Sequence, residues 1–541
     1  MKTFLPPLAL AAMLVLAGCR TTAHGGTAAL EQVDVVIHGG LLFDGEDQPG
    51  TIADVAIDGE RIVAVGTGLD ARYTAARRID ATGLVVAPGF IDPHTHPDTY
   101  IRAADPAARR NLPWLHQGVS TIFIGVDGDG TPDVAADLAW FDRQGTGTNL
   151  AAYVGLGPVR TRVMGHDDRA ADPDELARMR SLVAGAMCEG ALGLSTGLFY
   201  APQGFTRTAE VVALAREAAL RGGVYDTHQR DESTYSIGLL ASVEETLDIG
   251  AEAGLPVHIA HIKALGTDVH GQSAAVIERI NQARAAGQPV TADQYPWLAS
   301  STSLGAALLP RWAVDGGRPA LFARLDDAAT AVRIRAEMEA NLRRRGGAQA
   351  LLMIGPGWPW TGRTLADLAA DWKLDPVDAA LRVIGEGGID GHVATAQKVA
   401  SFNMAQTDVD AFMRQPWVMT ASDGGDGHPR QYATFPEKYA RFVAGAHVIS
   451  LQDFIHRSSG LTARTFGLED RGFLRAGKFA DVVVFDPQRY GPQASYTRPA
   501  ELSSGVIHLF VNGVPAIDGG QATDALPGRA LRHPAPAGSC P

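Results

Sequence analysis

The sequence contains little lysine, few cysteines and fewer positive than negative charges. The deficit of positive charge bears on whether the protein binds nucleic acid. Its 541 residues include 47 lysines and arginines against 60 acidic residues, so the formal net charge is −13. A chain of that charge repels polyanions, which excludes a nucleic-acid partner. Hydrophobic residues make up 46% and charged residues 20% of the chain. These proportions are typical of a globular protein and exclude a disordered or many-span membrane protein.

Only three cysteines are present, which is too few for a disulfide framework. Cys19 belongs to the N-terminal segment discussed below. Cys188 lies in a helix-like stretch, and we expect it to be a buried free thiol. Cys540 is close to the end of the chain, where we expect the backbone to be mobile.

The N-terminus has one lysine, a short apolar run and then Leu16-Ala17-Gly18-Cys19. The run is too short for a good membrane span, so residues 1–18 are interpreted as a signal peptide. An ordinary cleaved secretory signal is one reading. However, the last four residues resemble a bacterial lipobox, which implies cleavage before Cys19 and lipidation of its thiol. We therefore expect an exported lipoprotein at the outer membrane facing the periplasm, with a soluble periplasmic protein as the alternative.

Short strand-like runs broken by Gly and Asp occupy both ends of the chain after a tether at residues 19–32. Residues 33–86 contain three such runs, and residues 466–525 contain two more. These segments are expected to pair into one small β-sandwich built from both termini. Residues 526–541 form a tail.

Between these ends, strand-like and helical stretches alternate over residues 87–465. This alternation indicates a parallel barrel rather than an all-β fold. The Arg-rich helical stretch at about 300–350 interrupts it and is interpreted as an insertion. With 541 residues, one large domain and at least one smaller one are expected.

Histidines and acids follow several of the predicted strands. In GFIDPHTHPD, His94 and His96 are two residues apart, so they face the same side at the end of an apolar run. His228 ends VYDTH, His261 lies in HIAHIK, and Asp423 ends VMTASD. The C-terminal ends of parallel barrel strands form one face, so these side chains are expected to meet there and bind zinc or a similar metal. A solvated surface turn is the alternative for an isolated His-x-His pair.

These residues resemble the amidohydrolase superfamily, and within it the N-acyl-D-amino-acid deacylase (D-aminoacylase) branch. The resemblance covers most of the chain and rests on PGFIDPHTHPD, GVSTIFIG, VRTRVMG, EGALGLSTGLFYAP, THQRDE, HIKALG, DQYPW, SDGGDGHPR with TFP, and GLEDRGFLRAGKFADVVVFDP. It implies an α/β fold: a metal-bearing (β/α)8 TIM-type barrel with a small β-sandwich from both termini.

The resemblance also implies residue roles and a site with one or two Zn²⁺ ions. His94 and His96 would hold one metal position, His228 and His261 the other, and Asp423 would be a ligand and the general base. Candidates for binding substrate, chiefly its carboxylate, are Lys263, Tyr200, Arg230, Tyr295 and Arg430. Asp92 and Asp98 are candidates to hold the ligating histidines from behind, although Asp92 could equally cap a turn.

Lysine is scarce, and its positions narrow the choice within the superfamily. The six lysines are Lys2, Lys263, Lys373, Lys398, Lys438 and Lys478. Many superfamily members bridge two metals with a carboxylated lysine between the His-x-His strand and the next histidine ligand. No lysine stands there, which argues against hydantoinase or dihydroorotase types. Lys263 shares a strand face with His261, and a cation beside a metal site needs an offsetting anion such as a substrate carboxylate.

One position departs from the branch. Asp127, in Gly125-Val126-Asp127-Gly128, stands where the deacylases typically carry a cysteine ligand. A carboxylate can ligate or bridge zinc, and as a harder ligand it would loosen zinc selectivity. Alternatively, Asp127 caps a turn.

The resulting prediction is metal-dependent hydrolysis of an N-acyl-D-amino acid, or of a short peptide with a C-terminal D-residue, to a carboxylate and a free D-amino acid. The same scaffold could instead act on another acyl amide or a lactone. A third hypothesis is a non-enzymatic lipoprotein, against which the full set of His and Asp residues argues. The only membrane contact expected is a lipid anchor at Cys19.

Overall fold

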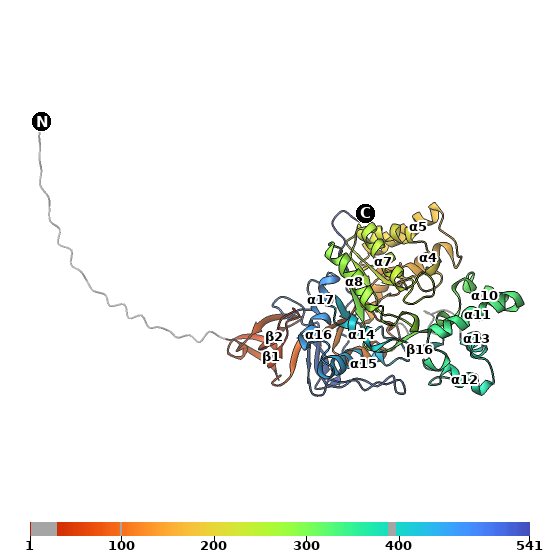
Figure 1. Ribbon diagram of the computed structural model, residues 1–541. Helices are drawn as coiled ribbons and strands as arrows, with labels where there is room; N and C mark the ends of the chain where they lie inside the picture. Colours follow the sequence, from red (N-terminus) through yellow and green to blue (C-terminus); the bar gives the residue numbers. More distant parts are fainter. Residues whose placement is uncertain (2–29, 98–99, 388–396, 541) are drawn as a thin grey trace.

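The computed structural model describes residues 1, 30–97, 100–387 and 397–540 and has the predicted α/β architecture (Figure 1). The predicted signal peptide, Cys19 and most of the tether lie outside these residues, as does Asp98. Within the described part of the chain, no helix is both long and apolar enough to span a membrane.

Both ends of the chain build one nine-stranded sheet, the β domain. It forms because strand β18 of the C-terminal part pairs antiparallel with β5 of the N-terminal part, for example Val484 with Val86. Side chains such as Val55, Ile57 and Phe510 fill its core. Its strands are β1 (Glu31–Leu42), β2 (Thr51–Asp58), β3 (Arg61–Gly66), β4 (Tyr73–Asp80), β5 (Val85–Pro88), β18 (Val482–Phe485), β19 (Val506–Val511), β20 (Val514–Asp518) and β21 (Gln521–Ala522).

The central domain is the barrel, and all its strand pairs are parallel. Thr95 bridges Gly424, and the Asp423 amide donates to the His94 carbonyl (2.9 Å), so the last strand closes on the first. Short, fully buried runs such as VSTIFI are typical of such strands. They are β6 (Phe90–Asp92), β7 (Val119–Ile124), β8 (Asn149–Ala152), β9 (Val154–Gly155), β10 (Gly193–Gly197), β11 (Val224–His228), β12 (Val257–Ile259), β13 (Val290–Gln294) and β17 (Val418–Thr420).

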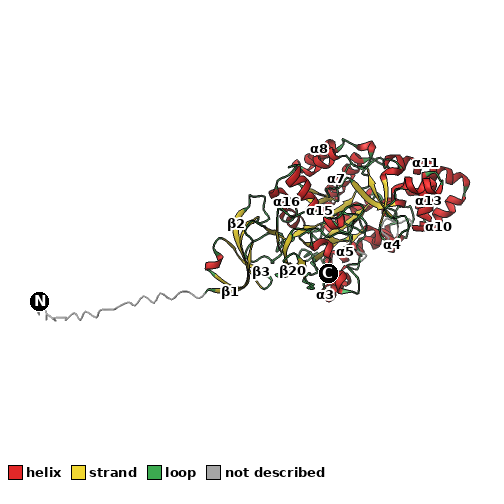
Figure 2. Ribbon diagram, turned by 90° about the horizontal axis from the view of Figure 1, so that it is seen from below, coloured by secondary structure: helices red, strands yellow, loops and turns green. Residues whose placement is uncertain are grey.

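Helices surround this barrel and bury their apolar faces against it (Figure 2). The start of α5 is set by a capping box, in which Asp172 and Glu175 each accept from the other's backbone amide. The helices are α1 (Pro106–Arg109), α2 (Leu112–Leu115), α3 (Val134–Gln144), α4 (Leu156–Met164), α5 (Pro173–Cys188), α6 (Thr208–Ala219), α7 (Leu239–Ala253), α8 (Ser273–Ala285), α14 (Gln406–Met413), α15 (Arg430–Glu437), α16 (Leu451–Arg457) and α17 (Gly460–Thr465).

An insertion subdomain interrupts the barrel between β13 and α14 and continues to Phe402, beyond the predicted end near residue 350. It has its own core around Leu304, Met338 and Val383. Its helices lie at the opposite end of the molecule from the β domain (Figures 1 and 2). The elements are β14 (Ala299–Ser303), α9 (Leu304–Leu308), α10 (Gly317–Asp326), α11 (Ala328–Arg344), β15 (Leu351–Ile354), α12 (Leu365–Trp372), α13 (Pro376–Gly387) and β16 (Lys398–Phe402).

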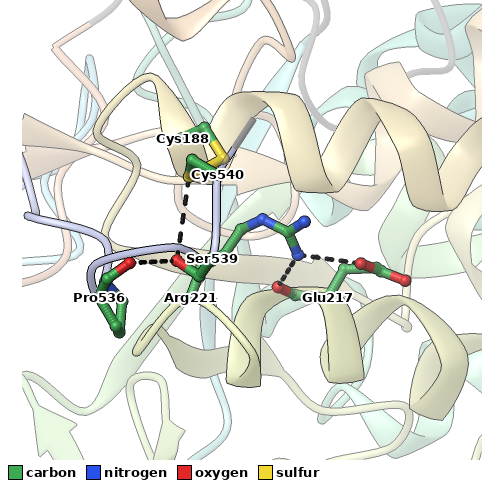
Figure 3. The surroundings of a disulfide bond; sticks show 6 residues. All are labelled: Cys188, Glu217, Arg221, Pro536, Ser539 and Cys540. Carbon is green, nitrogen blue, oxygen red and sulfur yellow. Dashed lines mark hydrogen bonds and ion pairs between the residues drawn. A yellow bond between two sulfur atoms is a disulfide. The ribbon is translucent and has the colours of Figure 1, made fainter.

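The C-terminal tail is held against the barrel, which corrects two expectations. Cys188 is not a free thiol and Cys540 is not at a mobile end, because the two form a disulfide at the end of α5 (Figure 3). Upstream, Ala530 bridges Leu150 in parallel, and the His533 amide donates to the Gly190 carbonyl (3.0 Å). The sequence could not show this pairing because 352 residues separate the two cysteines.

The disulfide predicts how the tail responds to a cysteine substitution. In the soluble form that begins after Cys19, Cys540→Ser should let the tail detach, because only the backbone and side-chain contacts upstream of it then remain. We expect faster proteolysis at Arg529 and Arg532 and a melting temperature lower by a few degrees, measured by limited trypsin digestion and calorimetry. Wild-type protein exported to the periplasm should show no free thiol; two titratable thiols would contradict the pairing.

Candidate metal centre

The structure brings six of the predicted residues together at the C-terminal face of the barrel. Two of them, His94 and His96, follow the same strand, β6. The other four each stand at the end of a strand of their own: Asp127 follows β7, His228 ends β11, His261 follows β12 and Asp423 follows β17. Within the described residues, the ligand atoms fall into overlapping groups whose members lie within 4.8 Å of one another: His94 with Asp127 and His261, His94 with His96 and Asp423, and His228 with His261 and Glu232. This is the arrangement that the strand-end argument predicts for the four histidines and Asp423, and Asp127, which the family resemblance pointed to, joins them.

Asp127 lies in the middle of this cluster. Its Oδ1 is 3.2 Å from His261 Nε2, 3.4 Å from His94 Nε2 and 3.7 Å from His228 Nδ1. Its Oδ2 is 3.6 Å from His96 Nε2. In the described part of the chain the carboxylate accepts no backbone amide, as a turn cap would. The geometry therefore favours the ligand reading of Asp127 over the turn-cap reading.

Asp423 closes the cluster on the side of the paired histidines. Its Oδ1 is 3.3 Å from His96 Nε2 and 3.9 Å from His94 Nε2. Its other oxygen, Oδ2, is 2.8 Å from Nη1 of Arg430. One oxygen of Asp423 thus faces the metal-ligand side chains while the other is held by a guanidinium.

Glu232 is a member of the site that the sequence reasoning missed. Its Oε1 is 3.3 Å from His261 Nδ1 and its Oε2 is 3.7 Å from His228 Nε2, so one carboxylate faces the outer nitrogens of both histidines. Oε1 also accepts from Nζ of Lys263 (2.6 Å). The only sequence signal was an acid four residues after His228 in THQRDE. An acceptor behind a ligating histidine orients its ring and sets its tautomer.

Three of these residues have left-handed backbone conformations. The φ angles are 54° at Asp127, 35° at His261 and 46° at Asp423. Such values are costly for residues other than glycine, and they gather where function over-determines the local structure. The backbone strain therefore marks the same positions as the ligand geometry.

The carboxylates of the cluster are kept ionised. Burial alone would raise the pKa of Asp127, but His94, His261 and His228 lower it well below its ordinary value. Burial acts the same way on Asp423, where Arg430 and then His261 lower the pKa. At Glu232, burial is opposed by Lys263 and His228, which lower the pKa. These groups are therefore acceptors ready for a cation.

The donor set fits a metal ion of the zinc type. His94 is completely buried, yet neither of its ring nitrogens makes a hydrogen bond within the described residues. Buried polar atoms of this kind are normally satisfied, so a missing partner at Nε2 indicates a ligand. Imidazoles and carboxylates within a few ångströms of one another are the ligands that zinc and related divalent metals use.

Asp92 holds the first and last strands of the barrel together behind the cluster. Its carboxylate accepts from Nε1 of Trp114 (2.8 Å), from the Ser422 amide (3.0 Å) and from the His94 amide (3.3 Å). Complete burial raises its pKa to about 7. Asp92 thus fixes the backbone at His94 and at Ser422, the residue before Asp423, rather than bonding to a histidine ring.

The predicted substrate residues Lys263, Tyr200, Tyr295 and Arg430 line the same cavity as the cluster. The Tyr295 hydroxyl and Nε of Arg430 are buried without a hydrogen-bond partner in the described part of the chain. The Arg430 guanidinium carbon lies 4.8 Å from the Tyr295 ring centre, and Lys263 Nζ lies 5.8 Å from it. Two unsatisfied donors on one wall indicate an acceptor supplied by a ligand.

Arg230 departs from the prediction that it contacts substrate. Its Nε and Nη2 bind Glu245 at 2.7 and 2.8 Å. Nη1 and Nη2 donate to the carbonyls of Gly204 (3.0 Å) and Thr206 (3.1 Å). The guanidinium is used up by these contacts and is not among the residues that line the cavity, so Arg230 holds a loop after β10 to α7.

Removing the charge of Asp127 tests its role as a ligand. Asp127→Asn should weaken metal binding by roughly tenfold or more, because a neutral amide, which is a weaker metal ligand, replaces the carboxylate at the centre of the cluster. Asp127→Cys should keep zinc and favour it over manganese, because a thiolate is softer. Both are measured by titration against a metal-binding dye. Asp133→Asn is the control, because Asp133 is an exposed carboxylate paired with Arg162. Unchanged metal affinity in Asp127→Asn would contradict the ligand role and support the turn-cap reading of Asp127.

Glu232→Gln tests the carboxylate behind His228 and His261. The amide cannot accept equally from both rings and leaves the Lys263 ammonium without its buried counter-ion, so metal affinity should fall roughly 10- to 100-fold. The same dye titration measures the loss, with Glu244→Gln on the outer surface of α7 as the control. A Glu232→Gln variant with wild-type affinity would show that the carboxylate only neutralises Lys263.

Comparisons with known proteins agree with this geometry. The model of the amidohydrolase family matches residues 77–516. A D-aminoacylase of Alcaligenes xylosoxydans xylosoxydans is 33% identical over 530 residues, which covers 93% of this chain and 98% of that protein. An N-acyl-D-glutamate deacylase of the same organism is 33% identical over 541 residues, covering 94% and 99%.

A solved structure shares the whole fold. The crystal structure of N-acyl-D-glutamate deacylase from Bordetella bronchiseptica, complexed with zinc and a phosphonate inhibitor, superposes with a TM-score of 0.77 at 30% identity. The superposition covers 93% of this chain and 100% of the deacylase chain. The chain therefore belongs to the amidohydrolase family, in its D-aminoacylase branch, and is a hydrolase of amide C–N bonds.

Proposed function

We propose that the protein is a zinc-dependent deacylase that hydrolyses N-acyl-D-amino acids to a carboxylate and a free D-amino acid. The observation that carries this proposal is the placement of Asp127, the four histidines and Asp423 beside a wall with two unsatisfied donors. The D-aminoacylase and N-acyl-D-glutamate deacylase relatives support the substrate class. A short peptide with a C-terminal D-residue has the same chemistry and is included.

One or two Zn²⁺ ions would be held by His94, His96, Asp127, His228, His261 and Asp423. The first position would use His94, His96 and Asp423, and the second His228 and His261, with Asp127 between them. A bound zinc ion supplies Lewis acidity that activates water and polarises the amide carbonyl.

Asp423 would act as the general base. Its pKa is lowered by Arg430, so it is ionised and free to accept the proton of the attacking water. The 2.8 Å contact with Arg430 fixes the orientation of the carboxylate while the proton is held. Asp423 then returns that proton to the leaving nitrogen, which departs as a neutral amine.

The wall of Tyr295, Arg430 and Lys263 would bind the carboxylate of the substrate next to the scissile amide. The Tyr295 hydroxyl and Arg430 Nε have no other partner among the described residues. Lys263 is not the free cation that the sequence suggested, because Glu232 neutralises it. Its Nζ is 2.6 Å from both Glu232 Oε1 and His261 Nδ1. An ammonium has three donors, so one N–H is left for the substrate in the cavity that Lys263 lines.

The site would work outside the cytoplasm. The signal-like N-terminus and the lipobox-like Leu16-Ala17-Gly18-Cys19 support export and lipidation at Cys19. The Cys188–Cys540 disulfide supports an oxidising compartment such as the periplasm. The enzyme would then face the periplasm from the outer membrane and act on small molecules there.

A substrate panel on the soluble form lacking residues 1–19 tests this function. With zinc bound, N-acetyl-D-amino acids should be hydrolysed and their L-enantiomers should not, and activity should vanish with complete chelation and return with zinc. Asp423→Asn should lower kcat roughly 100- to 10,000-fold, since it removes the base. Metal content is measured alongside each assay. Equal turnover of both enantiomers, or full activity without metal, would contradict the proposal.

A further inference from the structure

Arg345 is a buried guanidinium in the wall of the catalytic cavity. It directly follows α11 of the insertion subdomain and is 2% exposed. Its Nε donates to the Tyr235 hydroxyl (2.6 Å), and its Nη1 donates to the Ser300 hydroxyl (3.3 Å) and the Ser401 hydroxyl (3.4 Å). Ser300 and Ser401 are themselves partners in the β14–β16 ladder. The guanidinium is therefore held in place by hydroxyl groups from three segments.

These partners are all neutral. No carboxylate of the described residues forms an ion pair with Arg345, although it is among the largest fully buried side chains of the protein. By contrast, Lys263 and Arg430, the other buried cations of the cavity, contact Glu232 and Asp423. A buried charge without a counter-ion is costly, and a ligand that brings a negative charge removes that cost.

The cavity connects Arg345 with the metal-ligand cluster. Its lining includes Arg345, Ser300, Ser301 and Thr302 as well as Asp423 and three of the cluster histidines, His96, His228 and His261. At the metal end, the Tyr200 ring lies 4.8 Å from the His228 ring, and Thr302 donates to the Tyr200 hydroxyl (3.4 Å). Strand β14 thus presents consecutive hydroxyl groups from the cluster to Arg345. A polar substrate arm lying along β14 would end at the guanidinium.

We infer that Arg345 binds a second carboxylate of the substrate, distinct from the one next to the scissile amide. Resting on the deacylase function proposed above, this inference narrows the substrate to N-acyl-D-amino acids with an acidic side chain or an acidic acyl group. The first carboxylate meets Tyr295, Arg430 and Lys263 near the cluster, whereas the second reaches the insertion subdomain. Arg345 is then a specificity-determining residue, held for that purpose by Tyr235, Ser300 and Ser401.

Three substrates that differ in charge test the inference with the zinc-loaded enzyme. N-acetyl-D-glutamine carries one carboxylate, N-acetyl-D-glutamate adds one on the side chain, and N-succinyl-D-glutamine adds one on the acyl group. Wild-type enzyme should prefer one of the dianionic substrates over N-acetyl-D-glutamine by roughly 10- to 150-fold in kcat/KM, as expected for hydrogen bonds to a charged group. Which of the two is preferred identifies the arm that reaches Arg345.

Arg345→Met should remove that preference, mainly through KM, and leave hydrolysis of N-acetyl-D-glutamine within about twofold. Arg344→Met, one residue earlier and bonded instead to Thr234 and Asn341, is the matched control and should keep the preference. A structural role for Arg345 would lower all three activities together, and that result would overturn the inference.

A measurement on the wild type decides the matter if Arg345→Met does not fold. D-glutamate and D-glutamine have the same shape, so stronger product inhibition by D-glutamate, or by succinate over succinamate, supports the second carboxylate site. Equal inhibition within both pairs overturns it. Failure of the proposed deacylase function gives a different result from failure of the Arg345 inference. If the proposed function is wrong, the wild type hydrolyses none of the three D-substrates, whereas equal hydrolysis of all three overturns only the role of Arg345.

Discussion

The rest of the structure depends on keeping several buried histidines and carboxylates within contact of one another. Five ligand-type side chains from four strand ends gather around Asp127, and all of them except the partly exposed His96 are buried. Such a group is stable only with its charges balanced, which a divalent cation and the ionised carboxylates together achieve. The left-handed backbone at Asp127, His261 and Asp423 shows that the barrel accepts local strain to hold them there.

Much of this site could be predicted because barrel strands impose a simple rule on the sequence. His94 and His96 follow the C-terminal end of β6 and His261 follows that of β12, and in a parallel barrel all such ends meet on one face. The contacts of neighbouring loops follow no such rule. Glu232 was missed because it reaches His228 and His261 from a loop, and Arg230 was misassigned because Glu245 on α7 takes up its guanidinium.

The same reasoning explains which parts of the fold could be predicted. Alternating strands and helices indicate a barrel, and strand-like runs at both ends indicate a shared β domain, because each pattern is local to its own segment. Pairings between segments that are far apart in the sequence leave no local pattern. The Cys188–Cys540 disulfide and the extension of the insertion to β16 both depend on such pairings, so neither the tail nor the subdomain boundary was placed correctly from sequence.

On the proposed function, catalysis and selectivity come from different parts of the chain. The barrel strands hold the metal-ligand side chains in fixed positions, and the left-handed backbone at Asp127 and Asp423 leaves these two residues little conformational freedom. The insertion subdomain has its own core and supplies β14 and Arg345 to the cavity, whereas none of the six ligand residues lies in it. Among the described residues the Arg345 guanidinium has no ion pair, and the proposed role for it would let the protein keep the amide hydrolysis of its family while selecting its own substrates.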